Sequence, residues 1–191
     1  MYEVEVKVRA DHERVRRELD AHDAVHEGAV VQEDTYFDAP HRSFAETDEA
    51  LRVREVVGVG DDRSEDAVEA ALADASSRVT YKGPLVDTET KTREEHETGV
   101  DSGTEMRAIL DGLGFAEAAR VRKVRERYGF QGVTVTLDDV DGLGEFVEVE
   151  LETESEDDVP AARERAYEAM QSLGLDPDDG IRTSYLGLLL E

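Results

Sequence analysis

Residues 2–9 alternate without exception between apolar and charged side chains, and this pattern constrains the fold more than any other in the chain. The apolar set is Tyr2, Val4, Val6 and Val8, and the charged set is Glu3, Glu5, Lys7 and Arg9. Because successive side chains of a strand point to opposite faces, this stretch is predicted to be a β-strand with one apolar and one ionic face. Such a strand most often lies at a surface, with its charged face in water. The less common alternative is that the ionic face lines a closed polar chamber.

Seven later stretches are also predicted to be strands, and helices are predicted between and after them. The strands are residues 30–37, 51–56, 78–82, 88–100, 119–128, 133–138 and 146–151, and the helices are residues 11–21, 64–75, 102–113, 160–173 and 184–190. We expect Asp11 and Ser102 to cap their helices, and Gly83 with Pro84 to end the fourth strand. Strands that mostly follow one another, with interposed helices, indicate an α+β fold whose antiparallel sheet is large enough to curl or close.

The length of 191 residues is typical of a single domain, and we expect residues 1–191 to form one. Residues 58–77 are acidic and alanine-rich, and they are predicted to be a surface insertion between two strands. Residues 157–191 follow an acidic linker and are predicted to contain the C-terminal helices.

The chain carries 48 acidic residues against 22 lysines and arginines, which gives a net charge of −26. A surface this acidic disfavours nucleic acid and anionic membranes as partners. The sequence contains no cysteine, which excludes disulfides and thiol chemistry. It also contains no apolar run of the roughly 18 residues that a membrane-spanning helix needs. A cytoplasmic protein is therefore expected.

Lysine is scarce among the cations, since only Lys7, Lys82, Lys91 and Lys123 occur in the chain. Acid-rich, lysine-poor composition is typical of proteins from halophiles that accumulate salt. Self-repulsion is tolerable there because the Debye length falls to about 3 Å in 1 M salt. A local cationic pocket could bind an anion in such a solvent despite the negative net charge. Salt-dependent folding is the expected consequence of this halophilic composition.

His22 and His26 have a four-residue spacing that loosely resembles a zinc-binding helix. The predicted helix already ends near residue 21, no glutamate follows the first histidine, and no third ligand is evident. We therefore interpret both as exposed histidines at a helix end rather than as metal ligands.

At least six of the predicted strands carry an ionic face, and these faces concentrate the scarce cations. The cations are Lys7, Arg9, Arg52, Arg54, Lys82, Arg93, Lys123 and Arg125, and the accompanying carboxylates are Glu3, Glu5, Asp138, Glu148 and Glu150. Cations beside carboxylates suit a metal–polyphosphate ligand, because carboxylates bind Mg²⁺ or Mn²⁺ while Arg and Lys neutralise phosphate oxygens. Closure of the sheet would explain how so many charges face inward, since interior and exterior residues alternate along every barrel strand.

The same residues form an ordered series of motifs that resembles the CYTH superfamily, the triphosphate tunnel enzymes. The series comprises Glu3-x-Glu5-x-Lys7, Gln32-x-Asp34-x-Tyr36-Phe37-Asp38, Leu51-Arg52-x-Arg54, Thr80-Tyr81-Lys82-Gly83-Pro84, Arg93-x-Glu95-x-Glu97, Lys123-x-Arg125-x-x-Tyr128, Leu137-Asp138-x-Val140-x-Gly142-Leu143-Gly144-x-Phe146-x-Glu148-x-Glu150 and Ser184-Tyr185-Leu186. The first motif alone is weakly specific, but the ordered series spans residues 3–186. The second motif and the terminal one make the chain most similar to the class IV adenylate cyclase branch. The insertion at 58–77 departs from the short turn of relatives.

The resemblance implies an eight-stranded antiparallel closed β-barrel with flanking helices, whose tunnel binds a triphosphate and Mg²⁺ or Mn²⁺. The implied metal ligands are Glu3, Glu5, Asp138, Glu148 and Glu150, and the implied phosphate-binding residues are Arg52, Arg54, Lys82, Arg93, Lys123 and Arg125. Lys7 would be the catalytic cation, and Glu5, with Glu3, would support a metal or the attacking oxygen. For each of these residues the structural alternative is an ordinary ion pair within the barrel.

The ionic residues are compatible with three functions. An adenylate cyclase would convert ATP to 3′,5′-cyclic AMP and pyrophosphate, whereas a triphosphatase would hydrolyse tripolyphosphate, thiamine triphosphate or a nucleoside triphosphate. Catalysis in both cases consists of positioning and charge stabilisation, so the ionic lining does not separate them. A non-catalytic polyphosphate-binding module is the third class. Similarity of motifs favours the cyclase, and the resemblance also allows a homodimer.

Overall fold

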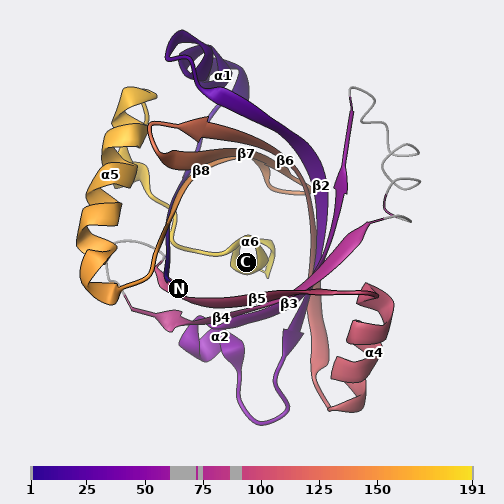
Figure 1. The fold of residues 1–191 in the computed structure, drawn as a ribbon. Coiled ribbons are helices and arrows are strands. Elements are labelled where there is room, and N and C mark those ends of the chain that lie inside the picture. Colours follow the sequence, from indigo (N-terminus) through magenta and orange to yellow (C-terminus); the bar gives the residue numbers. More distant parts are fainter. Residues whose placement is uncertain (1, 61–71, 73–74, 87–91, 191) are drawn as a thin grey trace.

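Eight antiparallel strands close into a barrel in the computed structural model, which describes residues 2–60, 72, 75–86 and 92–190 (Figure 1). Their order around the barrel is β1-β5-β4-β3-β2-β6-β7-β8. The strands are β1 (Tyr2–Arg9), β2 (Val25–Asp38), β3 (Ala50–Gly58), β4 (Ser76–Leu85), β5 (Arg93–Val100), β6 (Ala116–Phe130), β7 (Val133–Val140) and β8 (Gly144–Thr153). The closed barrel with flanking helices confirms the predicted fold class.

Most strands extend beyond their predicted bounds, and two of these differences overturn a prediction. The prediction that Gly83 and Pro84 end the fourth strand is wrong, because β4 continues to Leu85. The pairing of β4 with β5 shifts register between Lys82 and Leu85, so the Gly-Pro pair forms an irregularity near the end of the strand. The description of His26 as a helix-end residue is also wrong, because β2 already begins at Val25.

Some predicted elements fall on the parts of the chain that lie outside the described residues. The helix predicted at 64–75 belongs almost entirely to them, as do residues 88–91 of the strand predicted at 88–100. Gly58 and Ser77, at the edges of the predicted insertion, belong to β3 and β4. A short helix, α2 (Phe44–Thr47), lies before β3 and was not predicted.

Two helices cover the outer face of the barrel at β1, β7 and β8 (Figure 1). These are α1 (His12–Ala21) and α5 (Val159–Ser172). The outward-facing valines of β1 pack there with Leu19 of α1 and Met170 of α5, and all of these side chains are buried. The apolar face of the first predicted strand therefore forms core, as its alternation indicates.

A second outer layer covers strands β2 to β4. It contains α2 and α4 (Gly103–Gly112), whose side chains Phe44 and Leu110 pack with outward-facing Val53. Ser102 caps α4 by accepting a hydrogen bond from the Glu105 amide, and the predicted cap is confirmed. Asp11 caps α1 in the same way. None of the helices in the described part of the chain combines the length and the hydropathy needed to cross a membrane.

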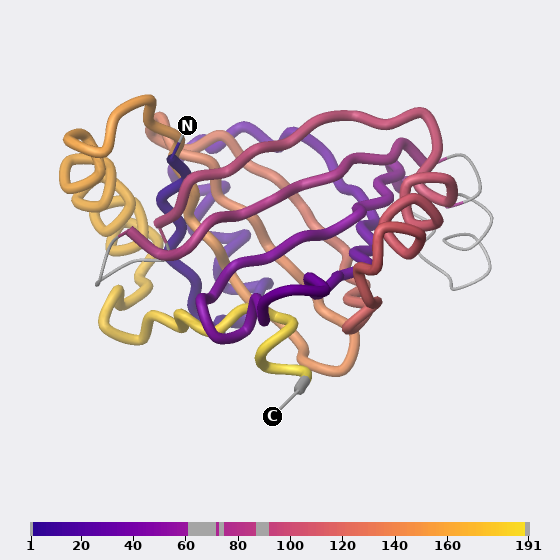
Figure 2. The backbone as a smooth tube through the Cα atoms, turned by 90° about the horizontal axis from the view of Figure 1, so that it is seen from below, coloured from indigo at the N-terminus to yellow at the C-terminus, as the bar shows by residue number. Residues whose placement is uncertain are grey.

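The C-terminal segment enters the barrel instead of covering it. After the short helices η1 (Glu156–Asp158) and η2 (Pro177–Asp179), helix α6 (Tyr185–Leu190) lies within the ring of strands when the barrel is viewed end-on (Figure 1). Figure 2, turned by 90°, places this segment at one end of the barrel. It packs there with inward-facing apolar residues, namely Tyr36, Val121, Val140 and Phe146. Helix α6 therefore fills one end of the barrel.

Leu19→Ala is expected to lower the free energy of unfolding by about 2–5 kcal/mol, because it leaves a cavity between α1 and the barrel. Leu113, which follows α4, is 65% exposed, whereas Leu19 is fully buried. The same truncation at Leu113 should change the free energy of unfolding by less than about 0.5 kcal/mol. Urea denaturation followed by circular dichroism measures both variants, and equal losses would contradict the described core.

Candidate functional site

The inward faces of the strands enclose a cavity of about 390 Å³. Nine of the chain's 22 lysine and arginine side chains line it, together with seven glutamates. Glu3, Glu5 and Lys7 are among these lining residues, and Lys7 is only 2% exposed. The charged face of β1 thus lies inside the barrel, and the polar chamber, not the solvated surface strand, is the correct interpretation of residues 2–9.

Asp34 on β2 holds two of the predicted phosphate-binding arginines. Arg54 of β3 binds its carboxylate through two hydrogen bonds, of 2.6 Å from Nε and 2.7 Å from Nη2. Arg52 lies 3.6 Å from the same carboxylate. Burial would raise the pKa of Asp34, but Arg54 and Arg52 outweigh it and hold the pKa well below its ordinary value. The arginine pair therefore faces a permanently ionised partner.

Lys82 of β4 lies between two carboxylates. Its Nζ is 2.8 Å from Glu95 of β5, and it also pairs closely with Glu3 of β1. Burial opposes ionisation of Glu3, but Lys82 outweighs it and lowers the pKa of Glu3 to about 2. Arg93, at the start of β5, donates hydrogen bonds of 2.6 Å to the carbonyl and 3.1 Å to the carboxylate of Asp48.

Lys123 and Arg125 of β6 converge on Asp138 of β7. Arg125 donates from Nε and Nη2 at 2.6 Å each, and Lys123 Nζ lies at 2.7 Å. The hydroxyl of Tyr185 donates a further hydrogen bond of 3.0 Å to the same carboxylate. Burial disfavours the charged form of Asp138, but Arg125 and Lys123 keep its pKa well below the ordinary value. Asp138 is a fully buried anchor for these two cations.

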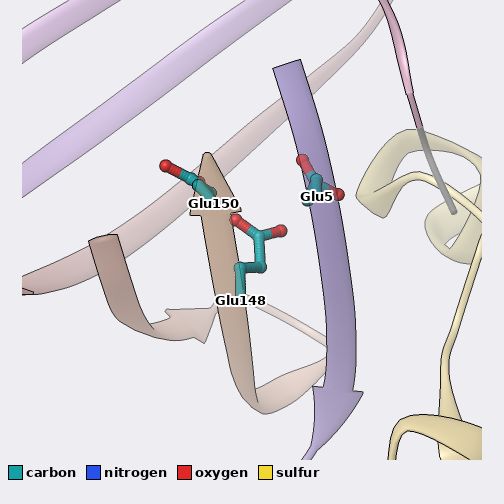
Figure 3. Close-up of side chains that lie close together, drawn as sticks. All are labelled: Glu5, Glu148 and Glu150. Atoms are coloured by element: carbon teal, nitrogen blue, oxygen red, sulfur yellow. The ribbon is translucent and has the colours of Figure 1, made fainter. Parts of the chain in front are cut away.

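Glu5, Glu148 and Glu150 form a group of three carboxylates, called here the carboxylate cluster (Figure 3). Each offers an oxygen within 4.8 Å of the others. The register of β1 with β8 places Glu5 opposite Glu150. Arg125 reaches the cluster, with a 3.0 Å hydrogen bond to Glu150 and a close one to Glu148. Like charges directly opposite across a sheet are destabilising, so the cluster needs a reason other than stability.

The pKa of Glu150 is raised by its burial and, to a smaller extent, by this crowding. Burial raises the pKa of Glu150 to about 7, and the neighbouring carboxylates add to the rise although Arg125 opposes it. Three converging carboxylate oxygens are the donor set that hard divalent cations such as Mg²⁺ or Mn²⁺ prefer. Glu5 and Glu150 also remain partly exposed to the cavity, which leaves room for further ligands. The residues present therefore fit a divalent metal ion.

The structure divides the predicted metal ligands into two groups. Glu5, Glu148 and Glu150 lie together, whereas Glu3 is engaged by Lys82, and Asp138 by the cations of β6. The role of Glu3 and Asp138 as metal ligands stays a prediction. The predicted phosphate-binding cations all line the one cavity, and they are Arg52, Arg54, Lys82, Arg93, Lys123 and Arg125.

Asp34 and Tyr185 have contacts that their motifs did not reveal. Asp34 alternates in phase with Gln32 and Tyr36, so its place on the inner face of β2 was predictable from the pattern. Its bidentate bond to Arg54 depends on the register of β2 with β3, which the pattern does not give. Tyr185 reaches the cavity only because the C-terminal segment folds back into the barrel.

Comparison with known proteins identifies the family. Residues 1–185 match the CYTH domain. The chain belongs to the CYTH family. CYTH domain proteins are generally enzymes, either adenylate cyclases or triphosphatases. They act on triphosphate substrates and in general depend on divalent metal ions. The mixed cation and carboxylate lining of this CYTH barrel agrees with that chemistry.

Two similar proteins span nearly the whole CYTH chain. A Methanocaldococcus jannaschii protein named "Putative adenylate cyclase MJ0240" is 36% identical over 189 residues, which is 98% of each chain. The solved structure of the PH1819 protein from Pyrococcus horikoshii OT3 has a TM-score of 0.85 and 35% identity, also over 98% of each chain.

A more distant structure shares the fold alone. It is the Hippeastrum protein HpAC1, described as a "putative adenylyl cyclase" with a dominant triphosphatase activity. Its TM-score is 0.57 at 20% identity, over 91% of this chain and 88% of its own.

Glu150→Gln is expected to raise the free energy of unfolding at about pH 8, without divalent ions, by about 1–3 kcal/mol. The pKa of Glu150 is about 7 in the folded protein, above the ordinary value of 4.5. The folded state is therefore penalised as the pH rises from 4.5 to 7, and a neutral amide avoids that penalty. Urea denaturation across this range should show the gain of the variant shrinking to nothing near pH 4.5.

Glu152→Gln is the matched control, because Glu152 is exposed and lies two residues further along β8. It should leave the free energy of unfolding nearly unchanged at every pH. Added Mn²⁺ should then stabilise the wild type more than Glu150→Gln, because the variant has lost a ligand. A Glu150→Gln protein no more stable than wild type at pH 8 would contradict the raised pKa.

Proposed function

We propose that this CYTH protein is a divalent-metal-dependent enzyme of the class IV adenylate cyclase type, which converts ATP to 3′,5′-cyclic AMP and pyrophosphate. The observation that carries the proposal is the single cavity that holds both the predicted phosphate-binding cations and the carboxylate cluster. A triphosphate needs the cations for its charge, and its metal needs the carboxylates. The 36% identity to the M. jannaschii protein, over nearly all of both chains, supports the cyclase over other triphosphate chemistry.

The arrangement of strands supports binding of an extended phosphate chain across the barrel. In the closed ring, β3 is four strands away from β8 in either direction, so Arg52 and Arg54 approach the cavity from the side opposite Glu148. Lys82 and Lys123 approach it from β4 and β6. Phosphate oxygens offer an arginine the same bidentate geometry that Asp34 offers Arg54, so a bound phosphate can share or replace these carboxylate contacts.

The cyclase reaction forms one bond and breaks one. The oxygen of the ATP 3′-hydroxyl attacks the α-phosphorus, and the bond from that phosphorus to the bridging oxygen of the β-phosphate breaks, so that pyrophosphate leaves. Glu5 is the proposed acceptor for the hydroxyl proton, because it lies in the carboxylate cluster. Lys7 Nζ lies 4.0 Å from Glu5 and would stabilise the charge that develops on the phosphoryl oxygens. A metal ion bound at the carboxylate cluster would supply Lewis-acid stabilisation of the phosphate oxygens.

Hydrolysis of tripolyphosphate or another triphosphate is the second candidate, and the lining of the cavity away from α6 favours it. Val30, six residues along β2 from Tyr36, lines that part with Arg78 and Arg127. The aromatic residues among the described lining are Tyr36 and Tyr185, and both pack in the cluster formed with α6. The described lining away from α6 thus offers a nucleobase no ring on which to stack. In this reaction water would attack the terminal phosphorus and the bond to the bridging oxygen would break.

A product assay separates the two candidates. The purified protein is incubated in about molar KCl, to screen its net charge, with Mg²⁺ or Mn²⁺ and with either ATP or tripolyphosphate. We expect cyclic AMP and pyrophosphate from ATP. Orthophosphate from either substrate, without cyclic nucleotide, would overturn the cyclase in favour of the hydrolase. Tight binding of tripolyphosphate without turnover would indicate a non-catalytic polyphosphate-binding module.

Glu148→Gln is expected to lower metal-dependent turnover by about 100-fold or more while the protein stays folded, because the amide is a poor ligand for a hard cation. Glu148 is 3% exposed, and an amide can still accept the hydrogen bond from Arg125. Glu168→Gln, on the exposed face of α5, is the matched control and should keep full activity. Retained activity in Glu148→Gln, with circular dichroism unchanged, would refute the assignment of the metal site.

A further inference from the structure

The C-terminal segment contacts the backbone of β1 directly, at Lys7. The amide of Ile181 donates a 2.7 Å hydrogen bond to the carbonyl of Lys7. Four residues later, Tyr185 begins α6 and is 6% exposed inside the barrel. Its ring meets Phe146 edge-on, with 5.0 Å between the ring centroids. The position of this tyrosine is therefore fixed by the strands around it.

Two lysine ammonium groups lie over the ring of Tyr185. The Lys7 ammonium lies 4.3 Å from the ring centroid, and the Lys123 ammonium lies 4.9 Å from it. The two lysines come from β1 and β6, which are not neighbours in the barrel. Both are almost fully buried, with exposures of 2% and 3%. A single aromatic ring thus links two cationic side chains across the interior.

The two lysine side chains are flexible, so an aromatic ring that contacts both ammonium groups can fix their positions. A lysine ammonium is a point charge on a flexible four-carbon stem, so packing must fix its position. The electron-rich face of an aromatic ring attracts a cation, most strongly where water is excluded. Lys123 also has Asp138 at 2.7 Å, whereas Lys7 has Glu5 at 4.0 Å as its ion-pair partner in the described structure. The ring therefore matters most for Lys7.

We propose that Tyr185 is a positioning residue, which holds Lys7 and Lys123 in place to bind the phosphate chain. The inference rests on the proposed function, because it assumes that a triphosphate occupies this cavity. The ring is the part of the side chain that acts on both lysines, and the hydroxyl serves the separate contact with Asp138. In this proposal the C-terminal segment contributes to the substrate site, in addition to packing inside the barrel.

Two substitutions at one position separate the ring from the hydroxyl. Tyr185→Phe keeps the ring, and Tyr185→Leu keeps apolar bulk without it. We expect Tyr185→Leu to weaken tripolyphosphate binding about 10-fold or more, and Tyr185→Phe to weaken it by less than about 3-fold. Isothermal titration calorimetry in EDTA measures this binding without a contribution from the metal. Equal weakening in both variants, or wild-type affinity in Tyr185→Leu, would overturn the proposal.

A control and a double variant exclude a merely structural effect. Leu188→Ala loosens the packing of α6 without touching either lysine, so it should keep tripolyphosphate affinity within about 3-fold of wild type. In a Lys7→Met background, Tyr185→Leu should cost less affinity than it does in the wild type, because one of its partners is already gone. Strict additivity of the two losses would overturn the proposal. A wild type that neither binds nor turns over a triphosphate would instead refute the proposed function itself.

Discussion

Charge buried inside a closed barrel is the constraint on which the rest of this structure depends. A buried charge left without a partner costs several kcal/mol, so the inner face can be ionic only where opposite charges meet. Asp34 with Arg54, Glu3 with Lys82, and Asp138 with Arg125 satisfy this condition between different strands. Each pair requires a particular register, because a slip of one residue would turn every side chain of a strand to the other face. The ion pairs therefore form only when the strands pair in the register of the closed barrel.

On four strands, the inward-facing side chains change from charged to apolar or aromatic at the same end of the barrel. Along β2 the inward residues pass from Asp34 to Tyr36, and along β8 they pass from Glu148 to Phe146. Along β6 they pass from Lys123 to Val121, and along β7 from Asp138 to Val140. Apolar side chains that face the interior need an apolar partner, and α6 supplies it. The strands therefore specify both a polar chamber and the place where the C-terminal helix fills the barrel.

The alternation of residue types made the inner face predictable, because a strand with one apolar side must turn the other side away from the core. It did not distinguish Asp138 from Glu150, which both face inward, on neighbouring strands. One is neutralised by Lys123 and Arg125, and the other faces Glu5 across the β1–β8 pair. That difference arises from pairing between strands, which a pattern within one strand does not contain. The continuation of β4 through Pro84 escaped prediction for the same reason, since the irregularity forms against β5.

The carboxylate cluster brings like charges close together, which lowers the stability of the fold. Most of the acidic chain can spread its negative charge over the surface, where about molar salt would screen it within about 3 Å. Glu5, Glu148 and Glu150 cannot do so, because they share one wall of a cavity with oxygens within 4.8 Å of one another. Nine cations and seven glutamates line the cavity, and the inward-facing Asp34 and Asp138 bind three of those cations. Charges of both signs are therefore nearly balanced there, inside a protein of net charge −26. A highly charged anion that carries a divalent cation matches both halves of this lining, whereas either ion alone would match only one. The composition of the cavity therefore meets the requirements of the metal–triphosphate complex that we propose as its ligand, and the fold alone does not require it.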